Sequence, residues 1–332
     1  MMAARRTKAF LDTGNTDLTG VASRSFGNAE AFATRHSCGF FTTDFRDLAE
    51  SDPDFILVET PHLAQRKVVS WALKQKYHML IGSCMAVNMR DMKSIRLAAA
   101  RHHLVLEGGF EARYSEVWRQ AKDVIRSGRL GEVSAVQATA CWAARTNSWY
   151  YSELQSGGMP LTHMTYAFLN PITWLFGMPR KLSAMANSIG EQVPGMVNEV
   201  TCVANMQYDN GMLCTLLASY IHHPSSPAWK ILIQGTGGAM ELLPGEFGGG
   251  RLVLHSKEGR PVDLDFSASP DPFKVQAEVV IEAVRGGENL LQNNPDQAIQ
   301  DVTLAAAIVR SARTAKTLTL PPPAFQPQGN PT

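Results

Sequence analysis

FILVET, residues Phe55 to Thr60, is the stretch that decides the fold. It is a continuous run of apolar and β-branched residues, a pattern typical of a parallel strand that is buried on both faces. Pro61 ends the run, and a helical pattern over residues 64–76 leads to a second apolar run, Tyr77 to Ile81. Strand, helix and strand in this order predict a βαβ unit with a right-handed crossover.

The same alternation extends in both directions from this unit. Short apolar runs occur at Leu18 to Ala22 and Phe40 to Thr42 before it, and at Leu104 to Glu107 after it. Together they predict a doubly wound parallel sheet, in which ligands bind beyond the carboxyl ends of the strands. The candidate cofactor-binding residues at this rim are Ser23, Arg24, Thr60, Pro61, His62 and Ser83.

From Glu132 onward the pattern changes to strand-like runs such as VSAVQATACW and MLCTLLASYI, which are separated by turn signals such as DNG at residues 209–211. These runs predict an open, mostly antiparallel sheet. We therefore expect a Rossmann-like domain over residues 1–128 and an α+β domain over residues 129–320 for substrate binding and oligomerisation. Residues 321–332 are rich in Pro, Gln and Gly, so we expect them to be disordered.

Composition narrows the function classes. The chain of 332 residues has 31 Lys and Arg against 30 Asp and Glu, a net charge of +1 that gives no reason to expect a nucleic-acid or membrane partner. Its 5 cysteines have no CxxC spacing, which argues against a disulfide framework and a zinc site, so we expect no metal. No run approaches the ~20 apolar residues of a membrane span or resembles a secretory signal, so we expect a cytoplasmic protein with a small-molecule substrate.

SGGMPLTHMTYAFLNPITWLFG, residues Ser156 to Gly177, is the candidate substrate-pocket segment. A Gly pair opens an apolar, helix-like run that carries His163 and Tyr166, the two candidate catalytic residues. Histidine titrates near neutral pH and is suited to acid–base work. A hydrogen-bonded pocket histidine without a chemical role is the alternative. Trp149 and Tyr150, just upstream, are expected to form a wall or lid of the pocket.

The order of these stretches, with DFILVETPHLAQ, ALKQKYHMLIGSCMA, LEGGFEARYS and IQGTGGAMEL, resembles the Gfo/Idh/MocA family of NAD(P)-dependent oxidoreductases. The resemblance implies a nicotinamide cofactor, sugar-like substrates, and homo- or hetero-oligomers that pack through the C-terminal sheet. It also implies that Ser23-Arg24 contacts an adenosine 2′-phosphate, which favours NADP over NAD, and that Arg113 shapes the pocket or the domain interface.

Three departures from the family pattern bear on chemistry. No strand with a Gly-rich phosphate turn precedes Leu18, and Ser83 stands where the family has a lysine. In the substrate segment His163, Ala167 and Asn170 stand where the family has Asp, His and a further Asp. Because these groups bind the cofactor and move the proton, we expect dinucleotide binding to be weak or lost.

Two functions therefore remain open. In the first, the chain is a homologue with a pocket for a sugar-like or cyclic hydroxy/keto molecule that lacks autonomous hydride transfer of the standard kind, as a non-redox enzyme or as a subunit of a heteromeric enzyme. In the second, it is an active NAD(P)-dependent dehydrogenase or reductase that uses His163 or Tyr166 as acid or base. Whether the first strand is lost, supplied by a partner, or encoded by a start further upstream also stays open.

Overall fold

Two small parallel sheets, rather than one, form the N-terminal part of the protein in this computed structural model, which describes residues 2–143, 149–156, 165–189, 197, 199–223, 225–245, 248–257 and 259–321. Strand β1 (Val21–Ala22) pairs with β2 (Phe41–Thr42). A separate sheet contains β3 (Phe55–Val58), β4 (His78–Gly82) and β5 (Leu106–Gly109). The parallel pairing confirms the expectation of an incomplete Rossmann-like sheet.

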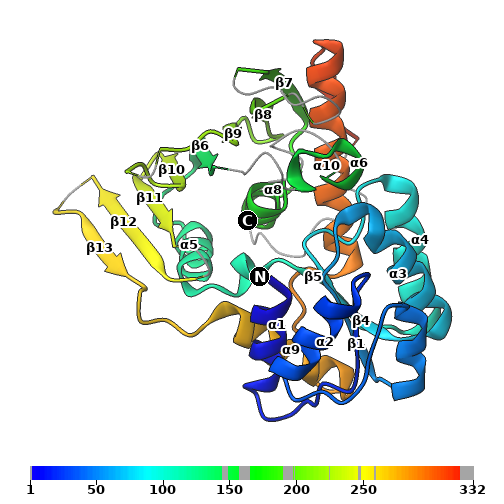
Figure 1. The fold of residues 1–332 in the computed structure, drawn as a ribbon. Coiled ribbons are helices and arrows are strands. Elements are labelled where there is room, and N and C mark those ends of the chain that lie inside the picture. Colours follow the sequence, from blue (N-terminus) through cyan, green and yellow to red (C-terminus); the bar gives the residue numbers. More distant parts are fainter. Residues whose placement is uncertain are drawn as a thin grey trace.

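Helices connect and cover these strands (Figure 1). They are α1 (Met2–Leu11), α2 (Phe26–Arg35), η1 (Phe45–Ser51), α3 (His62–Gln75), α4 (Met89–His102), η2 (Glu111–Tyr114) and α5 (Glu116–Arg126). The Asn88 side chain caps α4 by accepting the backbone N–H of Asp91, which satisfies one of the free donors of the first turn. The predicted strand from Leu18 to Ala22 is shorter than expected, because only its last two residues pair with β2.

A nine-stranded sheet forms the second half of the chain, in the order β13-β12-β11-β10-β6-β9-β8-β7-β14. Only β6 and β9 pair in parallel, so the prediction of a mostly antiparallel sheet is confirmed. Its strands are β6 (Val133–Cys141), β7 (Lys181–Asn187), β8 (Thr201–Gln207), β9 (Leu213–Ser219), β10 (Trp229–Gly235), β11 (Gly238–Pro244), β12 (Gly250–Ser256), β13 (Val262–Asp265) and β14 (Leu318–Thr319).

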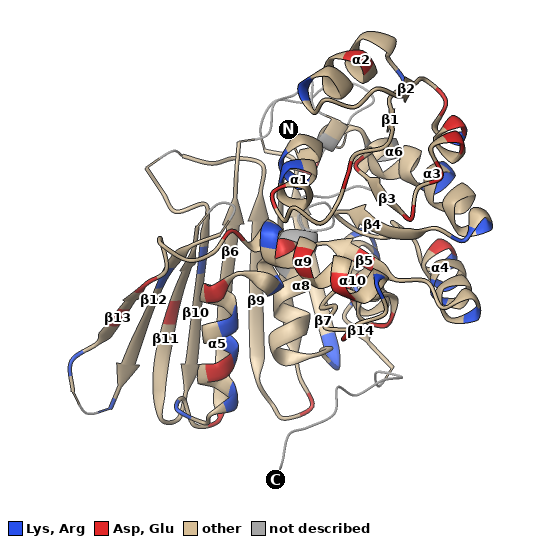
Figure 2. Cartoon of the chain, turned by 90° about the horizontal axis from the view of Figure 1, so that it is seen from below, with Lys and Arg blue, Asp and Glu red and all other residues tan. Residues whose placement is uncertain are grey.

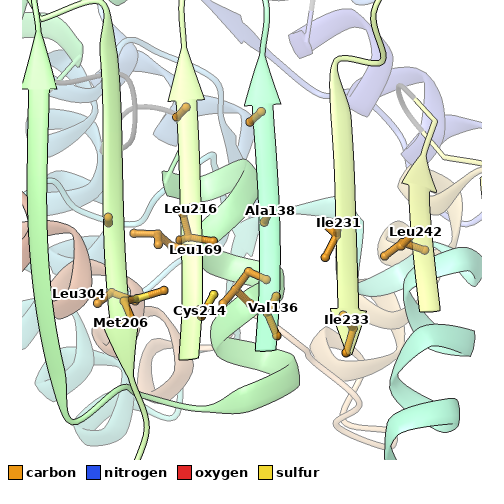
Figure 3. Close-up of a cluster of buried hydrophobic side chains, with 14 of the residues drawn as sticks. Val136, Ala138, Leu169, Met206, Cys214, Leu216, Ile231, Ile233, Leu242 and Leu304 are labelled. Carbon is orange, nitrogen blue, oxygen red and sulfur yellow. The ribbon is translucent and has the colours of Figure 1, made fainter. Parts of the chain in front are cut away.

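One face of this sheet carries the largest core. Alternate residues such as Val136, Ala138 and Leu216 are buried there, as expected for strands with period two. Figure 3 shows these side chains directed toward Leu169 of α8 (Thr165–Phe176) and Leu304 of α10 (Pro295–Thr314). Figure 2 shows α5 and α8 lying against that face. Pro171 lies inside helix α8.

The last two long helices return to the parallel sheets. Helix α9 (Pro272–Val284) lies beside α1, and its Val280 shares a buried cluster with Phe10 and Leu80. Helix α10 contributes Val302 to the core around β3 to β5 and Leu304 to the core of the large sheet. The two C-terminal helices therefore pack against both halves of the protein. The domain boundary that we placed between residues 128 and 129 stays a prediction. None of the described helices is long and apolar enough to span a bilayer.

Candidate functional site

A cavity of about 720 Å³ lies between the two parallel sheets. Strand β1 lines it on one side and residues Phe55–Val58 of β3 on the other. Helices α1 and α9 and the loops at residues 15–20 and 51–54 contribute to the rest of its wall. In the described chain no strand pairs with both β1 and β3. Within the described residues the parallel strands therefore form two separate sheets with the cavity between them.

The rim residues expected to bind a cofactor are distributed unevenly around this cavity. Ser23 and Thr60 line it, whereas Arg24 is exposed next to Ser23. Among the described residues the buried hydroxyl oxygen of Thr60 has no hydrogen-bond partner, so it is available to a ligand. Pro61 occupies the N-cap position of α3, directly before His62.

His62 and Ser83 are in direct contact at the carboxyl ends of β3 and β4. Nε2 of His62 lies 2.9 Å from the Ser83 hydroxyl, and Nδ1 lies 3.0 Å from the backbone carbonyl of Ser156. Because a carbonyl can only accept, Nδ1 carries the ring proton and Nε2 accepts from Ser83. Burial lowers the pKa of His62 to about 4, so the imidazole is neutral at pH 7.

Ser83 has a left-handed backbone with φ of 62°, which is uncommon for a residue with a side chain. This conformation turns the chain at the end of β4, and it places the hydroxyl against His62. The Ser83 side chain at this point is therefore a neutral hydrogen-bonding group that is held by an imidazole.

Arg6 supplies a positive charge to the same rim, and sequence reasoning did not identify it. From α1 its Nε lies 2.6 Å from a carboxylate oxygen of Glu59, Nη1 donates to Gln276 at 2.7 Å, and Nη2 donates to the carbonyl of Gly109. The side chain is only 4% exposed. Arg6 lies four residues before Phe10, which places both side chains on the same face of a helix. Because Phe10 is apolar, this spacing could have indicated that Arg6 also faces inward.

Arg113 and Asn170, which the sequence assigned to the substrate pocket, lie in a buried network between the two halves. Arg113 Nη2 donates to the Asn170 carbonyl at 2.7 Å and lies 3.7 Å from Asp301. The Asn170 amide donates to Asp301 at 2.8 Å and to Asn293 at 2.9 Å. These contacts hold η2, α8 and α10 together. The role of Arg113 and Asn170 in binding substrate stays a prediction.

The remaining pocket residues are only partly within the described chain. Trp149, in η3 (Trp149–Tyr151), lies edge-on to the His62 ring with centroids 5.1 Å apart. His163 lies outside the described residues, as do the side chains of Tyr150 and Tyr166. Their assigned roles as catalytic and pocket residues therefore stay predictions. The described residues also include no group of three or more His, Cys, Asp or Glu side chains that could hold a metal ion.

The described residues fit a dinucleotide only in part. Ser23, Arg24 and Thr60 offer polar groups at strand ends, as the adenosine side of such a site requires. However, pyrophosphate binding uses the N–H groups of a Gly-rich turn between a strand and a helix. The cavity stands where that strand and turn belong, so within the described chain the pyrophosphate has no cradle.

A split parallel sheet joined to a large, mostly antiparallel sheet defines a protein with a Rossmann-like part and an open-sheet part. Residues 1–110 match the family described as "Oxidoreductase family, NAD-binding Rossmann fold", and residues 118–241 match "GFO/IDH/MocA C-terminal domain". The chain belongs to the Gfo/Idh/MocA family of oxidoreductases.

Several of the similar proteins have names that refer to sugars or related molecules. The chain is 24% identical to scyllo-inositol 2-dehydrogenase (NADP(+)) IolU of Bacillus subtilis (strain 168), over 91% of this chain and 90% of that protein. Its fold is similar to levoglucosan dehydrogenase in complex with NADH, with a TM-score of 0.85, 15% identity, and 97% and 96% of the two chains covered. It is also similar to aldose-aldose oxidoreductase from Caulobacter crescentus, with a TM-score of 0.80, 20% identity and 91% of each chain covered.

Proposed function

We propose that this chain binds a sugar-like or cyclic hydroxy/keto molecule, and that the 332-residue chain does not carry out the family's standard hydride transfer alone. The single observation that carries the second half of the proposal is the cavity between β1 and β3. The class of substrate rests on the sugar-related names of the relatives.

Weak dinucleotide binding follows from the interrupted sheet. A pyrophosphate held by a helix N-terminus gains from several converging N–H groups and from the helix dipole. In the described chain these groups are not presented by a turn between β1 and β3. Any residual affinity rests on rim residues such as Ser23, Arg24 and Thr60. Arg24 is suited to a 2′-phosphate, which favours NADP over NAD.

Proton transfer is altered as well. A lysine at the end of β4 would supply a charged donor, whereas Ser83 supplies a neutral hydroxyl whose proton is directed to His62. Protonation of the buried imidazole is unfavourable at neutral pH, because burial lowers its pKa to about 4. His62 therefore orients the Ser83 hydroxyl, but it does not readily accept a proton at neutral pH.

The exposed face of the large sheet supports the proposal of an oligomer. Met185 on β7 and Leu213 on β9 are 67% and 56% exposed, on the face opposite the core. A continuous exposed apolar patch is typical of subunit interfaces, and these two side chains lie on one face of the sheet with strand β8 between them. A homo- or hetero-oligomer that packs through this face would cover them.

An active NAD(P)-dependent dehydrogenase is the second candidate. It is supported by the similarity over nearly the whole chain to a levoglucosan dehydrogenase that binds NADH. In this case His163 or Tyr166 takes the acid–base role, and a His163→Ala variant loses turnover. A loss of about a hundredfold or more is expected from removing a general acid or base.

A binding and turnover panel separates the two candidates. Inositols, aldoses and anhydrosugars are titrated calorimetrically into the purified chain, and oxidation of NADH and NADPH is followed with each. The proposal expects at least one sugar-like ligand to bind without dinucleotide, and no turnover above background. Steady turnover by the 332-residue chain would instead establish the second candidate.

A further inference from the structure

The Ser83 hydroxyl has a fixed hydrogen-bond polarity. Nε2 of His62 lies 2.9 Å from it, and Nδ1 of the same ring lies 3.0 Å from the Ser156 carbonyl. Because a carbonyl oxygen cannot donate, the ring proton is on Nδ1 and Nε2 offers only a lone pair. The Ser83 hydroxyl donates its proton to that lone pair. Toward a ligand, its oxygen can therefore only accept a hydrogen bond.

This polarity persists at neutral pH and is set at the junction between the two halves of the protein. Burial lowers the pKa of His62 to about 4, so Nε2 remains unprotonated near pH 7. Ser156 lies in α6 (Glu153–Ser156), and Trp149 of η3 lies edge-on to the His62 ring. Residues from both halves of the protein therefore meet around the Ser83 hydroxyl.

Arg6 is the arginine of this rim, and its donors are directed to protein groups. Nε lies 2.6 Å from a carboxylate oxygen of Glu59, Nη1 donates to Gln276, and Nη2 donates to the Gly109 carbonyl. The Arg6 side chain is buried, with 4% of it exposed. A buried guanidinium with these partners has little capacity left to donate to a ligand.

Two carboxylates lie at the same rim. Glu59 Oε1 would be 2.5 Å from a Cβ atom placed on Gly82, the residue before Ser83, so the Glu59 carboxylate fills that space. Glu111 lies 3.5 Å from Nη2 of Arg6, and its side chain is 26% exposed. The rim thus has two carboxylates for one guanidinium, and the excess charge is negative.

Ser83 keeps accepting capacity that the described chain does not use. The residue is half-buried directly after β4, and within the described ranges its hydroxyl has one side-chain partner, His62. A hydroxyl oxygen keeps its lone pairs when it donates, so Ser83 can still accept from a ligand. Thr60, next to Glu59 in the chain, has a hydroxyl that can act in either sense. The rim therefore presents mainly acceptors.

We propose that this rim recognises a hydrogen-bond donor on the ligand, so that Ser83 binds the hydroxyl or amino form of a sugar-like molecule and rejects a keto, carboxylate or phosphate group at the same position. The inference rests on the proposed function, because it names the substrate class of that pocket. A hydroxyl or ammonium group donates to the Ser83 oxygen. A keto oxygen or an anion would face a lone pair and an excess of carboxylate charge.

A lysine at this position would select the opposite chemistry. Its ammonium has donors and no acceptor, so it suits a carbonyl or an anionic oxygen. The resemblance to the family matches Ser83 to a lysine, and the Ser83 hydroxyl already donates to His62. The chain thus differs from the family pattern in the direction of the hydrogen bond as well as in charge.

Matched probes test this polarity in calorimetric titrations of the purified chain at pH 7 and constant salt. The first pair is myo-inositol and the ketone formed by oxidising one of its hydroxyls. The second set is glucosamine, glucose and glucuronic acid, which present an ammonium, neutral hydroxyls and a carboxylate. The proposal expects the hydroxyl and amino probes to bind about tenfold more tightly than the keto and carboxylate probes, because one hydrogen bond is made or lost.

Two variants separate recognition from packing. Ser83→Ala removes the acceptor, so the hydroxyl and amino probes should lose about tenfold in affinity and the keto probe should change little. His62→Phe keeps the Ser83 hydroxyl but frees its proton, so the keto probe should gain affinity and the preference should shrink. Ser94→Ala is the control, since Ser94 lies exposed on α4 and donates to the Arg90 carbonyl. A purely structural role would lower stability without changing the order of the probes.

The nitrogen NMR shifts of His62 report its tautomer without any ligand, with the signals assigned by their loss in His62→Phe. The inference expects the proton on Nδ1, and a proton on Nε2 overturns it. Equal affinities for the hydroxyl, amino and keto probes also overturn it, and leave the binding of a sugar-like molecule standing. An unchanged order of affinities in Ser83→Ala has the same consequence. If the folded chain binds none of the probes, the proposed function fails and this inference fails with it.

Discussion

The Ser83 hydroxyl lies 2.9 Å from Nε2 of His62, and this contact joins the ends of two neighbouring parallel strands. The two residues are 21 positions apart in the sequence. The ring is fixed on its other side by the Ser156 carbonyl, so its tautomer and orientation are both set. The resemblance to the family matches Ser83 to a lysine, and the structure shows a neutral, oriented hydroxyl at Ser83.

We expect the protein to become less stable as the pH is lowered, because His62 is buried in its neutral form. Its pKa is lowered from 6.5 to about 4. Between pH 6.5 and pH 4 the imidazole is therefore protonated in the unfolded chain and neutral in the folded chain. The part of the unfolding free energy that depends on neutral His62 is fully present above pH 6.5. It is lost as the pH falls toward 4, by about 3 kcal/mol in total. Urea unfolding of the wild type and His62→Gln across this range measures it.

Ser83→Ala is the matched variant for that measurement. It removes the hydroxyl but leaves the ring buried, and burial is the main cause of the lowered pKa. We expect Ser83→Ala to keep the pH dependence that His62→Gln loses. An identical pH dependence in the wild type and His62→Gln would show that the ring is not buried neutral.

Removing Arg6 is expected to destabilise the protein strongly. The carboxylate of Glu59 would remain buried at the rim without its partner 2.6 Å away, and burial already raises its pKa against the opposing effect of Arg6. The loss for Arg6→Ala should be about 3 to 5 kcal/mol. Lys8→Ala on the same helix breaks an exposed pair with Asp12 and should cost about 0.5 kcal/mol or less. Comparable losses for the two variants in urea unfolding would contradict the network around Arg6.

Asn170→Asp tests the buried amide contacts between α8 and α10. The amide nitrogen donates to Asp301 at 2.8 Å, so a carboxylate there would face a second buried carboxylate. We expect a loss of about 3 to 5 kcal/mol at pH 7, and a smaller loss near pH 4, where the new carboxyl can stay protonated.

Asn170→Ala is the comparison for this site. It removes the donors without adding a charge, so it should cost only about 1 to 3 kcal/mol and show little extra dependence on pH. If Asn170→Asp were as stable as the wild type at pH 7, the buried network between α8 and α10 would not be as described.

The exposed face of the large sheet provides a test of association. The double variant Met185→Lys, Leu213→Lys places charges on two side chains that are now 67% and 56% exposed. If this face is the subunit interface, sedimentation should show a smaller assembly while circular dichroism stays unchanged. Unchanged sedimentation of a folded double variant would locate the interface elsewhere or leave the protein monomeric.

Much of the fold could be predicted from local patterns. FILVET and the run up to Ile81 became β3 and β4, because continuous apolar strands are the strongest sign of a buried parallel sheet. The run from Leu18 was predicted too long, since pairing depends on a neighbour and only β2 is available to it. Short strands of this kind are decided by tertiary contacts, which local propensity does not contain.

The site was predictable only in outline. The sequence placed His62 and Ser83 at one rim, and the structure brings them into contact. Arg6 was not foreseen, because its partners Glu59 and Gln276 lie far along the chain and only the folded sheet assembles them. The sequence showed that no strand with a Gly-rich turn precedes Leu18, but the cavity between β1 and β3 could not be foreseen, because segments far apart in the chain line it.

Calorimetric titration of NADPH into the 332-residue chain tests the central claim most directly. The interrupted sheet predicts no saturable binding below about 1 mM, a binding free energy weaker than about −4 kcal/mol. A dissociation constant in the micromolar range, with one dinucleotide bound per chain, would contradict the account, because it would require a complete pyrophosphate site although no described strand joins β1 and β3.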